Sequence, residues 1–388
     1  MQTVSTTVAC PLHDSFRVQQ VAGLFDLPLA ERLSETFVAE LPSSDDAWTI
    51  GAIVGPSGSG KSTLARAAFG PAVYSPGEWP TDRAIVDCLG DDSIQRITRV
   101  LTAVGLGSPP AWVKPYHVLS GGERFRCDLA RALLTVPSPG ATAGSAQQSE
   151  PGTDAPPLDK PAVGPKERLV VFDEFTSVVD RTVARFASAA IARALRSDGS
   201  TRFVAVTCHY DVLEWLQPDW VLDLASGKLT WGCLRRPELR IVVRRCPQRT
   251  WRMFARHHYL SGALSRGATC YLALWEGRPV AFCAVVAMLG RSRYKRITRI
   301  VTLPDFQGLG IGTRLVERVC EHYQERGIRV GITATHPAIL GYCRKSPRWR
   351  FVRMRKTGHL TRQRVGERQI RSSAGRSVVS FEYVGSHG

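Results

Sequence analysis

The chain has 388 residues, of which 44% are hydrophobic and 22% are charged, so it is long enough for two or three globular domains with buried cores. Its longest apolar run, residues 279–290, is too short to cross a bilayer, and no basic segment followed by an apolar one opens the chain. Ten cysteines without CxxC or CxxxH spacing predict reduced thiols rather than disulfides or a zinc knuckle. We therefore expect a cytoplasmic protein with no membrane segment.

Charge divides the chain into two unlike parts. Residues 1–230 contain 20 Lys and Arg against 26 Asp and Glu, a net charge of −6, whereas residues 231–388 contain 31 against 8, a net charge of +23. So basic a region repels itself unless it meets a polyanion. Nucleic acid is the first partner that this predicts, and an anionic membrane surface is the second.

The first element in chain order with a chemical signature is a strand, residues 48–54, which runs into GPSGSGKST and then a helical segment. Strand, glycine-rich loop and helix in this order let backbone N–H groups converge on phosphate oxygens. Lys61 would reach the β and γ phosphates of ATP, and the Ser62 hydroxyl would bind Mg²⁺. A simple Gly/Ser-rich turn is the alternative. The predicted phosphate-binding residues are Gly55, Ser57, Gly58, Gly60, Lys61, Ser62 and Thr63.

Two adjacent carboxylates follow the apolar run at residues 169–172. An apolar run that ends in acids is typical of a buried parallel strand, whose carboxyl end is where such sheets bind ligands. We expect Asp173 to hold Mg²⁺ and Glu174 to polarise the attacking water. A helix cap is the alternative, although the preceding glycine-rich loop disfavours it.

Between these segments, LSGGERFRCDLARAL at 119–133 resembles the signature motif of ABC-type ATPases. Ser120, Gly121 and Gly122 would then open a helix whose N-terminus points at the γ-phosphate. The same residues are also consistent with an ordinary capping box between Ser120 and Glu123. The resemblance further implies that His209, after a strand at 202–209, senses the γ-phosphate, that Asp180 belongs to the D-loop, and that 219–231 form a closing hairpin.

This resemblance covers residues 15–232 and implies a homodimer through the ATPase domains, with two ATP molecules between signature and P-loop of opposite subunits. One departure is that no strand ends in a Q-loop glutamine. A strand predicted at 83–87 places Asp87 there, as a Mg²⁺ ligand or as a turn residue. Phe25 is a candidate for stacking on adenine or for core packing. Residues 135–167, rich in Pro, Gly, Ser and Ala, are predicted to be a disordered insertion.

A second glycine-rich loop, QGLGIG at 307–312, lies between a strand predicted at 296–306 and a helix at 313–327. It resembles the acyl-CoA-binding loop of GNAT acyltransferases, in which N–H groups at a helix N-terminus take the CoA pyrophosphate. A Rossmann loop is the alternative, but the Gly-x-Gly-x-x-Gly spacing is missing. The resemblance implies acetyl-CoA or another acyl-CoA-type donor. Its binding residues would be Gln307, Gly308, Gly310, Gly312 and Thr313.

The flanking sequence is consistent with GNAT architecture. Residues 269–289 read as two strands joined by a turn, 328–337 as the next strand, and the segment after it as a short helix and a final strand. GNAT enzymes often place a general-acid tyrosine on that helix, and Tyr342 occupies a similar position. A purely structural core role for Tyr342 is the alternative.

A narrower resemblance joins 251–264, 303–312 and 335–339: together they look like the phage Mom DNA-modification proteins, GNAT-related enzymes that carbamoylmethylate N6 of adenine. It implies roles for four residues: His258 as base or metal ligand, Tyr259 and Arg299 as anchors, and Asp305 as a positioning acid. Each residue also has a structural alternative. In that alternative the histidine is a core or surface group, Arg299 does no more than neutralise phosphate, and Asp305 does no more than shape the turn.

The basic C-terminal region interleaves arginine with aromatic residues, which favours phosphate binding and base stacking. On a strand, Arg348 and Arg350 would share one face while Trp349 and Phe351 bury the other. Arg353 and Arg355 continue the basic stretch, and a Ser/Gly-containing tail with further arginines, such as Arg362 and Arg376, is expected to order on binding.

The sequence thus predicts an α/β protein with a P-loop ABC-type nucleotide-binding domain at 1–232 followed by a GNAT-like mixed α/β acyltransferase domain at 233–388. The expected function is an ATPase coupled to a Mom-like transferase that modifies nucleic acid, with DNA adenine N6 as the acceptor. Two alternatives stay open: a GNAT enzyme acting on a protein or small-molecule amine with a regulatory ATPase, and the ATPase subunit of a transporter.

Overall fold

The computed structural model describes residues 1–9, 15–26, 34–43, 45–135, 168–232, 237–258, 264–288, 290–356 and 377–385. The chain forms two compact units, and neither is a continuous stretch of sequence. Unit 1 comprises Met1–Gly77, Arg131–Val178 and Ala194–Arg236; unit 2 comprises Glu78–Ala130, Val179–Arg193 and Pro237–Gly388. The sequence predicts a boundary after residue 232. The compact units instead group parts of the first half of the chain with the second half.

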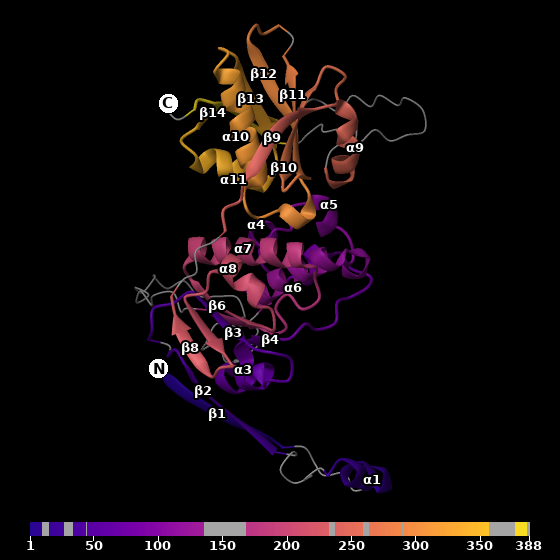
Figure 1. The fold of residues 1–388 in the computed structure, drawn as a ribbon. Coiled ribbons are helices and arrows are strands. Elements are labelled where there is room, and N and C mark those ends of the chain that lie inside the picture. The colour runs from indigo at the N-terminus through magenta and orange to yellow at the C-terminus, as the bar shows by residue number, and fades with distance from the viewer. Residues whose placement is uncertain are drawn as a thin grey trace, which may run out of the picture. The chain divides into compact units, whose positions relative to one another are not determined.

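Unit 1 is built on a six-stranded sheet in the order β4-β5-β6-β3-β7-β8, in which only the β7–β8 pair is antiparallel (Figure 1). Its central strand β3 is buried at all five positions, as its apolar sequence IGAIV predicts. Strand β6 lies between β3, which leads into the first glycine-rich loop, and β5, which ends at the paired acids. The strands are β3 Ile50–Val54, β4 Val73–Tyr74, β5 Arg168–Phe172, β6 Thr201–Thr207, β7 Trp220–Asp223 and β8 Lys228–Trp231.

The remaining elements of unit 1 include a separate antiparallel ribbon, β1 Gln2–Ala9 with β2 Ser34–Leu41. Val4, Ala39 and Leu41 of this ribbon are buried with Leu64 and Ala65 of α3 in one hydrophobic cluster. The helices are α1 Phe16–Phe25, α3 Lys61–Phe69, η1 Gly70–Ala72, η4 Tyr210–Val212 and α8 Leu213–Leu216.

Unit 2 contains a seven-stranded sheet in the order β14-β15-β13-β12-β11-β10-β9 (Figure 1). The β12–β13 pair is parallel and the other pairs are antiparallel. The strands are β9 Ile241–Cys246, β10 Thr269–Trp275, β11 Arg278–Ala287, β12 Tyr294–Thr302, β13 Arg329–Ala334, β14 Trp349–Lys356 and β15 Ser377–Tyr383. Helix α10, Ile311–Gln324, packs its buried side chains, such as Leu315 and Val319, into the core on this sheet.

Helices from the first half of the chain also belong to unit 2. Helix α6, Gly121–Thr135, begins in unit 2, and the boundary falls after Ala130; helix α7, Arg181–Asp198, is divided after Arg193. The other helices of unit 2 are η2 Ile85–Cys88, α4 Ile94–Ala103, α5 Pro109–Trp112, η3 Tyr116–Val118, η5 Gln248–Thr250, α9 Trp251–Phe254, η6 Ala255–His257, η7 Pro304–Phe306 and α11 Pro337–Lys345.

Most predicted strands are confirmed, and three differences have local causes. The strand expected at 83–87 is the 3-10 helix η2, in which Asp87 N donates to the Ala84 carbonyl, so Asp87 does not end a strand. Strand β6 ends at Thr207, two residues before His209. The chain does not end after β14: β15 inserts between β13 and β14, so part of the expected tail is a sheet strand.

Several predictions fall on residues outside the described ranges: the disordered insertion from 136 to 167, Tyr259, and the tail arginines at 362 and 376. Among the described residues, the eight cysteines are free thiols. No helix in the described part of the chain has both the length and the apolar character needed to cross a membrane.

Candidate functional site

The first glycine-rich loop of unit 1 opens onto a cavity of about 370 Å³. Gly58 and Gly60 have positive φ angles of 80° and 78°, which a residue with a side chain rarely adopts, and Gly60 caps the N-terminus of α3. Lys61 bends back so that its Nζ donates to the Pro56 carbonyl at 2.6 Å. The cavity is lined by Val8, Glu35, Phe37, Ser57, Gly58, Gly60, Lys61, Ser62, Thr63 and Glu174. Backbone amides and a lysine around a cavity of this size suit the phosphates of a nucleotide.

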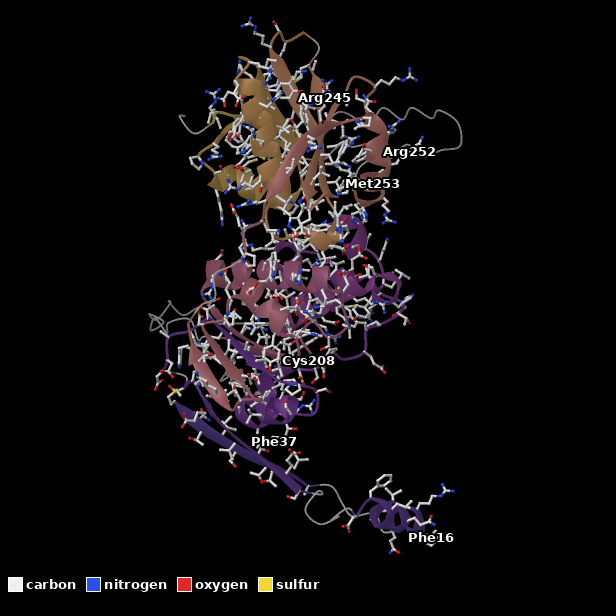
Figure 2. All side chains as sticks on the ribbon, viewed as in Figure 1. Phe16, Phe37, Cys208, Arg245, Arg252 and Met253 are labelled. Atoms are coloured by element: carbon white, nitrogen blue, oxygen red, sulfur yellow. The ribbon has the colours of Figure 1, made fainter. Side chains whose placement is uncertain are left out.

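An aromatic ring lies beside this loop. Phe37 of β2, labelled in Figure 2, lies so close that a Cβ built on Gly60 would be 2.4 Å from its ring. Sequence reasoning selected Phe25 for stacking on a base, but Phe25 is 70% exposed on α1 and does not line the cavity. No sequence signal separates these two phenylalanines, because the ribbon β1–β2 that brings Phe37 to the loop is a tertiary arrangement.

The paired acids lie where the sequence predicts. The Ser62 hydroxyl donates to Asp173 Oδ1 at 2.8 Å, and Arg66 Nη2 lies 3.5 Å from Asp173 Oδ2. Glu174 adopts a left-handed φ of 56° and lines the cavity. A hydroxyl next to a carboxylate is the donor set with which a protein holds Mg²⁺ on a bound nucleotide, since that ion keeps waters and phosphate oxygens as its other ligands. The described residues contain no cluster of three or more His, Cys, Asp or Glu, so a purely protein-ligated metal has no site among them.

The signature segment forms the predicted capping box at the start of α6. The Ser120 amide and hydroxyl donate to Glu123 Oε2 at 3.0 and 2.9 Å, and the Glu123 amide donates back to Ser120 Oγ at 3.4 Å. Asp180 caps α7 by accepting from the amides of Thr182 and Val183. The amide of His209 donates to Thr207 Oγ1, and His209 does not line the cavity of the first glycine-rich loop.

The second glycine-rich loop leads into α10 of unit 2 with the geometry of a helix N-terminal cradle. Gly308 and Gly310 have φ angles of 92° and 76°, and Gly310 is the N-cap of α10. At Gly312 an added Cβ would be 2.7 Å from Thr302 Oγ1, so only glycine fits there. The first amides of a helix lack intrahelical partners and attract anions. Thr313 Oγ1 donates to the Gly310 carbonyl at 2.8 Å and thereby stabilises this first turn.

Strands β12 and β13 separate immediately before this loop. Their parallel pairing runs from Tyr294 with Arg329 to Ile297 with Ile332, while β12 continues to Thr302. A β-bulge interrupts the β11–β12 register where Ala284 pairs with Arg299 and Val285 with Ile297. Bulges re-aim the backbone at functional sites. After Ile297, β12 stays paired with β11 but no longer pairs with β13, so the two parallel strands diverge on the way to the N-terminus of α10.

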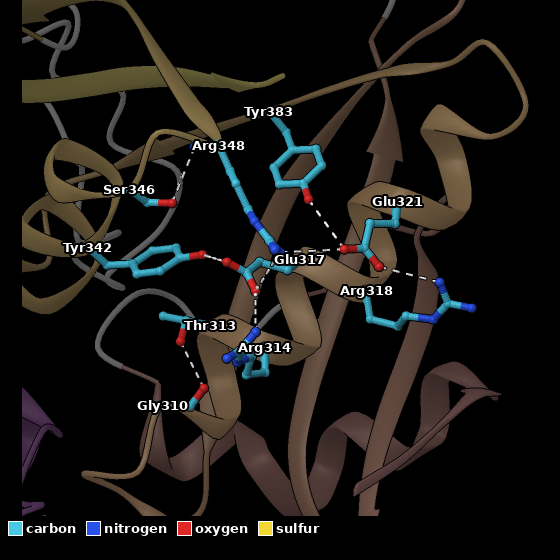
Figure 3. A network of polar contacts seen from close by, with 10 residues as sticks. All are labelled: Gly310, Thr313, Arg314, Glu317, Arg318, Glu321, Tyr342, Ser346, Arg348 and Tyr383. Carbon is cyan, nitrogen blue, oxygen red and sulfur yellow. Dashed lines mark hydrogen bonds and ion pairs between the residues drawn. The ribbon is translucent and has the colours of Figure 1, made fainter. Parts of the chain in front are cut away.

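Tyr342 of α11 lies next to a buried carboxylate on α10, shown in Figure 3. Its hydroxyl donates to Glu317, which is 7% exposed and lies 3.3 Å from Arg348 Nη1 and 3.4 Å from Arg314 Nη1. Burial, together with this hydrogen bond, raises the pKa of Tyr342 above its ordinary value. Tyr342 therefore keeps its proton at neutral pH, as a general acid requires. Glu317 was not predicted, because its place in an amphipathic helix reads as a solvated position.

The other predicted transferase residues lie on different elements of unit 2, and Tyr259 lies outside the described residues. Asp305 lies in η7. Burial raises its pKa above the ordinary value, although the charge of Arg126 opposes this shift. His258 follows η6, with its ring 5.6 Å from that of Trp251. Arg299 lies on β12 and donates to the Thr298 carbonyl at 2.9 Å. Arg126 of α6 donates through Nη2 to the Asp305 carbonyl at 3.1 Å, so the backbone of Asp305 contacts this helix.

Two of the predicted nucleic-acid residues have carboxylate partners. Arg348 pairs with Glu317 and Glu321 at 3.3 and 3.6 Å, and Arg350 pairs with Glu382 at 3.2 Å. The predicted burial of Phe351 is wrong: Phe351 pairs in register with Phe381 of β15, yet it is 59% exposed. Arg353 and Arg355 are exposed on the edge strand β14.

A basic helical surface next to His258 was missed. Arg249, Arg252 and Arg256 are exposed along η5, α9 and η6, and Figure 2 labels Arg252 with its neighbour Met253. Their spacing of three and four residues is the signal that could have identified them, because it puts three cations on one face of a helical segment. This surface precedes His258 directly in the chain.

The comparisons with known proteins identify one region. Residues 229–345 match the model of the acetyltransferase (GNAT) family. No curated protein matches the chain. Among solved structures, it is similar to an IAA acetyltransferase from Bacillus cereus, with 14% identity over 37% of this chain and 99% of that one and a TM-score of 0.27.

Two further similar structures are the ribosomal-protein-S18-alanine N-acetyltransferase from Escherichia coli and an acetyltransferase from Bacillus subtilis in complex with CoA. The first is 12% identical over 37% of this chain and 93% of that one, with a TM-score of 0.29. The second is 15% identical over 38% and 98%, with a TM-score of 0.30. With the sheet, the separating strands and the glycine loop described above, the family match leads to one conclusion: the chain contains a GNAT acetyltransferase domain at residues 229–345.

Proposed function

We propose that this chain is an ATPase-coupled acyltransferase that moves an acyl group from an acyl-CoA-type donor to nucleic acid, with N6 of DNA adenine as the acceptor. The observation that carries the transferase is the loop QGLGIG at the N-terminus of α10, next to the point where β12 and β13 separate, inside the region that matches the GNAT family. The N-terminal cradle suits the donor's pyrophosphate, and the point where β12 and β13 diverge suits its extended arm.

In the transfer step, the acceptor nitrogen attacks the thioester carbonyl carbon, the new C–N bond forms, and the C–S bond breaks. Tyr342 donates its proton to the leaving sulfur, and the acceptor nitrogen loses one proton to a base, for which His258 is our candidate. Glu317 orients the Tyr342 hydroxyl between turnovers through its hydrogen bond. Arg348 and Arg314 form ion pairs with Glu317 at 3.3 and 3.4 Å and hold its carboxylate beside Tyr342.

For the ATPase, support comes from the cavity of the first glycine loop and from the resemblance of the signature segment to that of ABC-type ATPases. Lys61 would bind the phosphates, Ser62 and Asp173 would hold Mg²⁺, and Glu174 would polarise the attacking water. When bound, Mg²⁺ neutralises charge that develops on the phosphate oxygens. Because one chain has one P-loop and one signature, we propose a homodimer in which Ser120, Gly121 and Gly122 of one subunit complete the site of the other.

The acceptor proposal depends on charge. Residues 231–388 have a net charge of +23, and the exposed arginines of the segment before His258 form a cationic surface next to a candidate base. Phosphate contacts of this kind position DNA without reading its sequence. The Mom resemblance, which rests on 251–264, 303–312 and 335–339, adds adenine N6 to the proposal.

The test is mass spectrometry of nucleosides from cells that express the wild-type chain, Gly310→Val or Glu174→Gln. A new adenine adduct with the wild type that is lost in Gly310→Val supports the transferase, and its loss in Glu174→Gln supports ATP coupling. The matched control is Gly267→Ala, because a Cβ at Gly267 would meet no atom within 4 Å. Unmodified nucleosides, together with acetylation of proteins or amines in the same cells, would contradict the nucleic-acid acceptor and favour the amine alternative.

A further inference from the structure

The glycine loop at 307–312, called the donor loop below, is held by segments from the first half of the chain. All of these contacts lie within unit 2. The Gly107 amide donates to Gln307 Oε1 at 2.6 Å, while Gln307 Nε2 donates to the Thr302 carbonyl at 2.9 Å. The side chain of Gln307 therefore joins the turn after α4 to the end of β12, instead of extending toward a ligand.

Two helices contact the backbone of the donor loop and its approach. Arg126 of α6 is fully buried, and its Nη2 donates to the Asp305 carbonyl at 3.1 Å. Arg193 of α7 donates through Nη1 to the Gly308 carbonyl at 3.4 Å. Because both bonds end on backbone carbonyls, they constrain the path of the loop whatever side chains it carries.

The backbones approach so closely that larger residues do not fit. A Cβ built on Gly308 would be 2.4 Å from the Ala190 Cβ of α7, and one on Gly105 would be 3.0 Å from the Gln307 carbonyl oxygen. Both glycines also have positive φ angles, of 92° and 90°. Packing at this distance transmits displacement, since a well-packed interface cannot deform continuously.

Apolar packing completes the contact. Phe186 of α7 is fully buried in the core of the GNAT domain, with its ring 5.1 Å from that of Trp275 and 4.8 Å from that of Phe306. Phe306 directly precedes the donor loop. Helix α7 is thus a structural part of the transferase, although it follows the D-loop segment of the proposed ATPase in the chain.

The same helices begin at the proposed nucleotide elements. Helix α6 starts directly after Ser120 of the signature segment, and α7 starts directly after Asp180. Both continue across the unit boundary, after Ala130 and Arg193. A helix is stiff along its axis, so a shift at its first turn is carried to Arg126, about one turn later in α6, and to Arg193, about three turns later in α7.

We propose that Arg126 and Arg193 are positioning residues for the donor loop, and that through them the signature and D-loop helices couple the nucleotide state to the affinity for the acyl-CoA donor. This inference rests on the proposed function. It adds the residues that would couple the two activities. Arg126 and Arg193 act through the Asp305 and Gly308 carbonyls and do not touch the donor.

The experiment measures the Kd of acetyl-CoA by calorimetry, and the donor KM and kcat, on the full chain. For Arg126→Gln we expect the donor Kd and KM to rise about tenfold with kcat changed less than about twofold, and for Arg126→Lys a rise of about threefold. Arg193→Ala, at an exposed position, is expected to raise both about threefold. The matched control is Arg131→Ala on the same helix, whose Nη1 donates to Gly77 instead, with an unchanged Kd.

The nucleotide arm uses Glu174→Gln, which is expected to hold ATP without hydrolysing it. Adding ATP should change the donor Kd at least threefold in this chain, and the change should disappear when Arg126→Gln or Arg193→Ala is added. If Arg126→Gln fails to fold by circular dichroism, Arg193→Ala decides the result. Donor affinity that is unchanged in Arg193→Ala and insensitive to ATP would overturn the inference while the transferase stands. A wild-type chain that binds no acetyl-CoA would overturn the proposed function itself.

Discussion

The two glycine loops have nearly the same backbone angles at the helix N-cap, but different side chains surround them. Gly60 caps α3 with φ 78° and ψ 11°, and Gly310 caps α10 with φ 76° and ψ 16°. Around the first loop are Lys61, Ser62 and the acids of β5, which together suit a phosphate that is to be cleaved. Around the second are the Arg193 bond and the end of β12, which no longer pairs with β13, and these suit a phosphate that only anchors a ligand. The shared geometry suits an anion at both loops, and the neighbouring side chains distinguish the chemistry proposed for each.

The largest effect should come from removing chemistry at the first loop. We expect Glu174→Gln to lower ATP hydrolysis by about 100-fold or more, because general base catalysis contributes roughly 10² to 10⁴. Phosphate release under saturating ATP measures this, and equilibrium binding should show that ATP is still held. Hydrolysis at the wild-type rate would mean that the first loop, like the second, only anchors its ligand.

The next effect should come from removing Tyr342, the proposed general acid of the transferase. Tyr342→Phe is expected to lower kcat for acyl transfer by about 100-fold with the donor KM nearly unchanged, since the hydroxyl acts in the transition state. Glu317→Gln should reduce kcat less and should lower the alkaline limb of the pH–rate profile, because the carboxylate helps to raise the pKa of Tyr342. ATP hydrolysis is the internal control and should not change in either variant. If Tyr342→Phe and the wild type had equal kcat values, Tyr342 would be a core residue and not the general acid.

Blocking each cradle separately tests whether the loops are independent ligand sites. Gly310→Val puts a branched side chain at φ 76°, and we expect the acetyl-CoA Kd to rise about tenfold while ATP binding is unaffected. Gly267→Ala serves as the control with open space around it. A variant that loses both ligands would indicate global unfolding, which a thermal melt distinguishes.

A smaller effect should show whether the exposed arginines before His258, rather than the glycine loops, hold DNA. Replacing Arg252 and Arg256 with alanine should weaken DNA binding several-fold and reduce the slope of log K against log salt by about one per residue. The control is Arg240→Ala, an exposed arginine that pairs with Glu238 at 3.1 Å. A salt slope equal to that of the wild type would remove this surface from the acceptor site.

The smallest effect is a pH dependence at the support of the donor loop. His336 accepts from the Ala338 amide through Nδ1 and donates through Nε2 to the Gly107 carbonyl at 2.9 Å, so it is neutral and in the Nε2–H tautomer. Burial lowers its pKa. The folded state therefore binds this proton less readily than the unfolded state, and stability present above about pH 6.5 is lost as the pH falls. Denaturant titrations should show stability that falls as the pH is lowered from about 6.5 to about 5, and His336→Gln should lack this fall.

The local motifs could be predicted, because their geometry depends on neighbours in the chain. Gly58, Gly60 and Lys61 follow a buried strand, and Gly308 and Gly310 follow β12, as the residue pattern predicts. Ser120 and Glu123 form their capping box within three residues. Strand composition likewise predicts β5, β10, β11 and β13, since each is apolar on its buried positions.

Partners that are distant in the sequence could not be predicted. The charges of Arg348 and Arg350 indicate a phosphate-binding ridge, yet Glu317 and Glu382 reach them across the fold. Phe351, which strand alternation would bury beside Trp349, is 59% exposed. Phe37 reaches the first loop only through the β1–β2 ribbon.

By itself, the sequence determined two glycine cradles at helix N-termini, the acids after β5, and a chain divided between an acidic and a basic part. Only the tertiary structure decided that the helices after Ser120 and Asp180 are built into the GNAT domain, with Arg126 on the Asp305 carbonyl and Phe186 in its core. The physical reason is that helix formation depends on local spacing, whereas the partner that a buried face selects depends on the shape of a surface formed by residues more than 100 positions away in the chain.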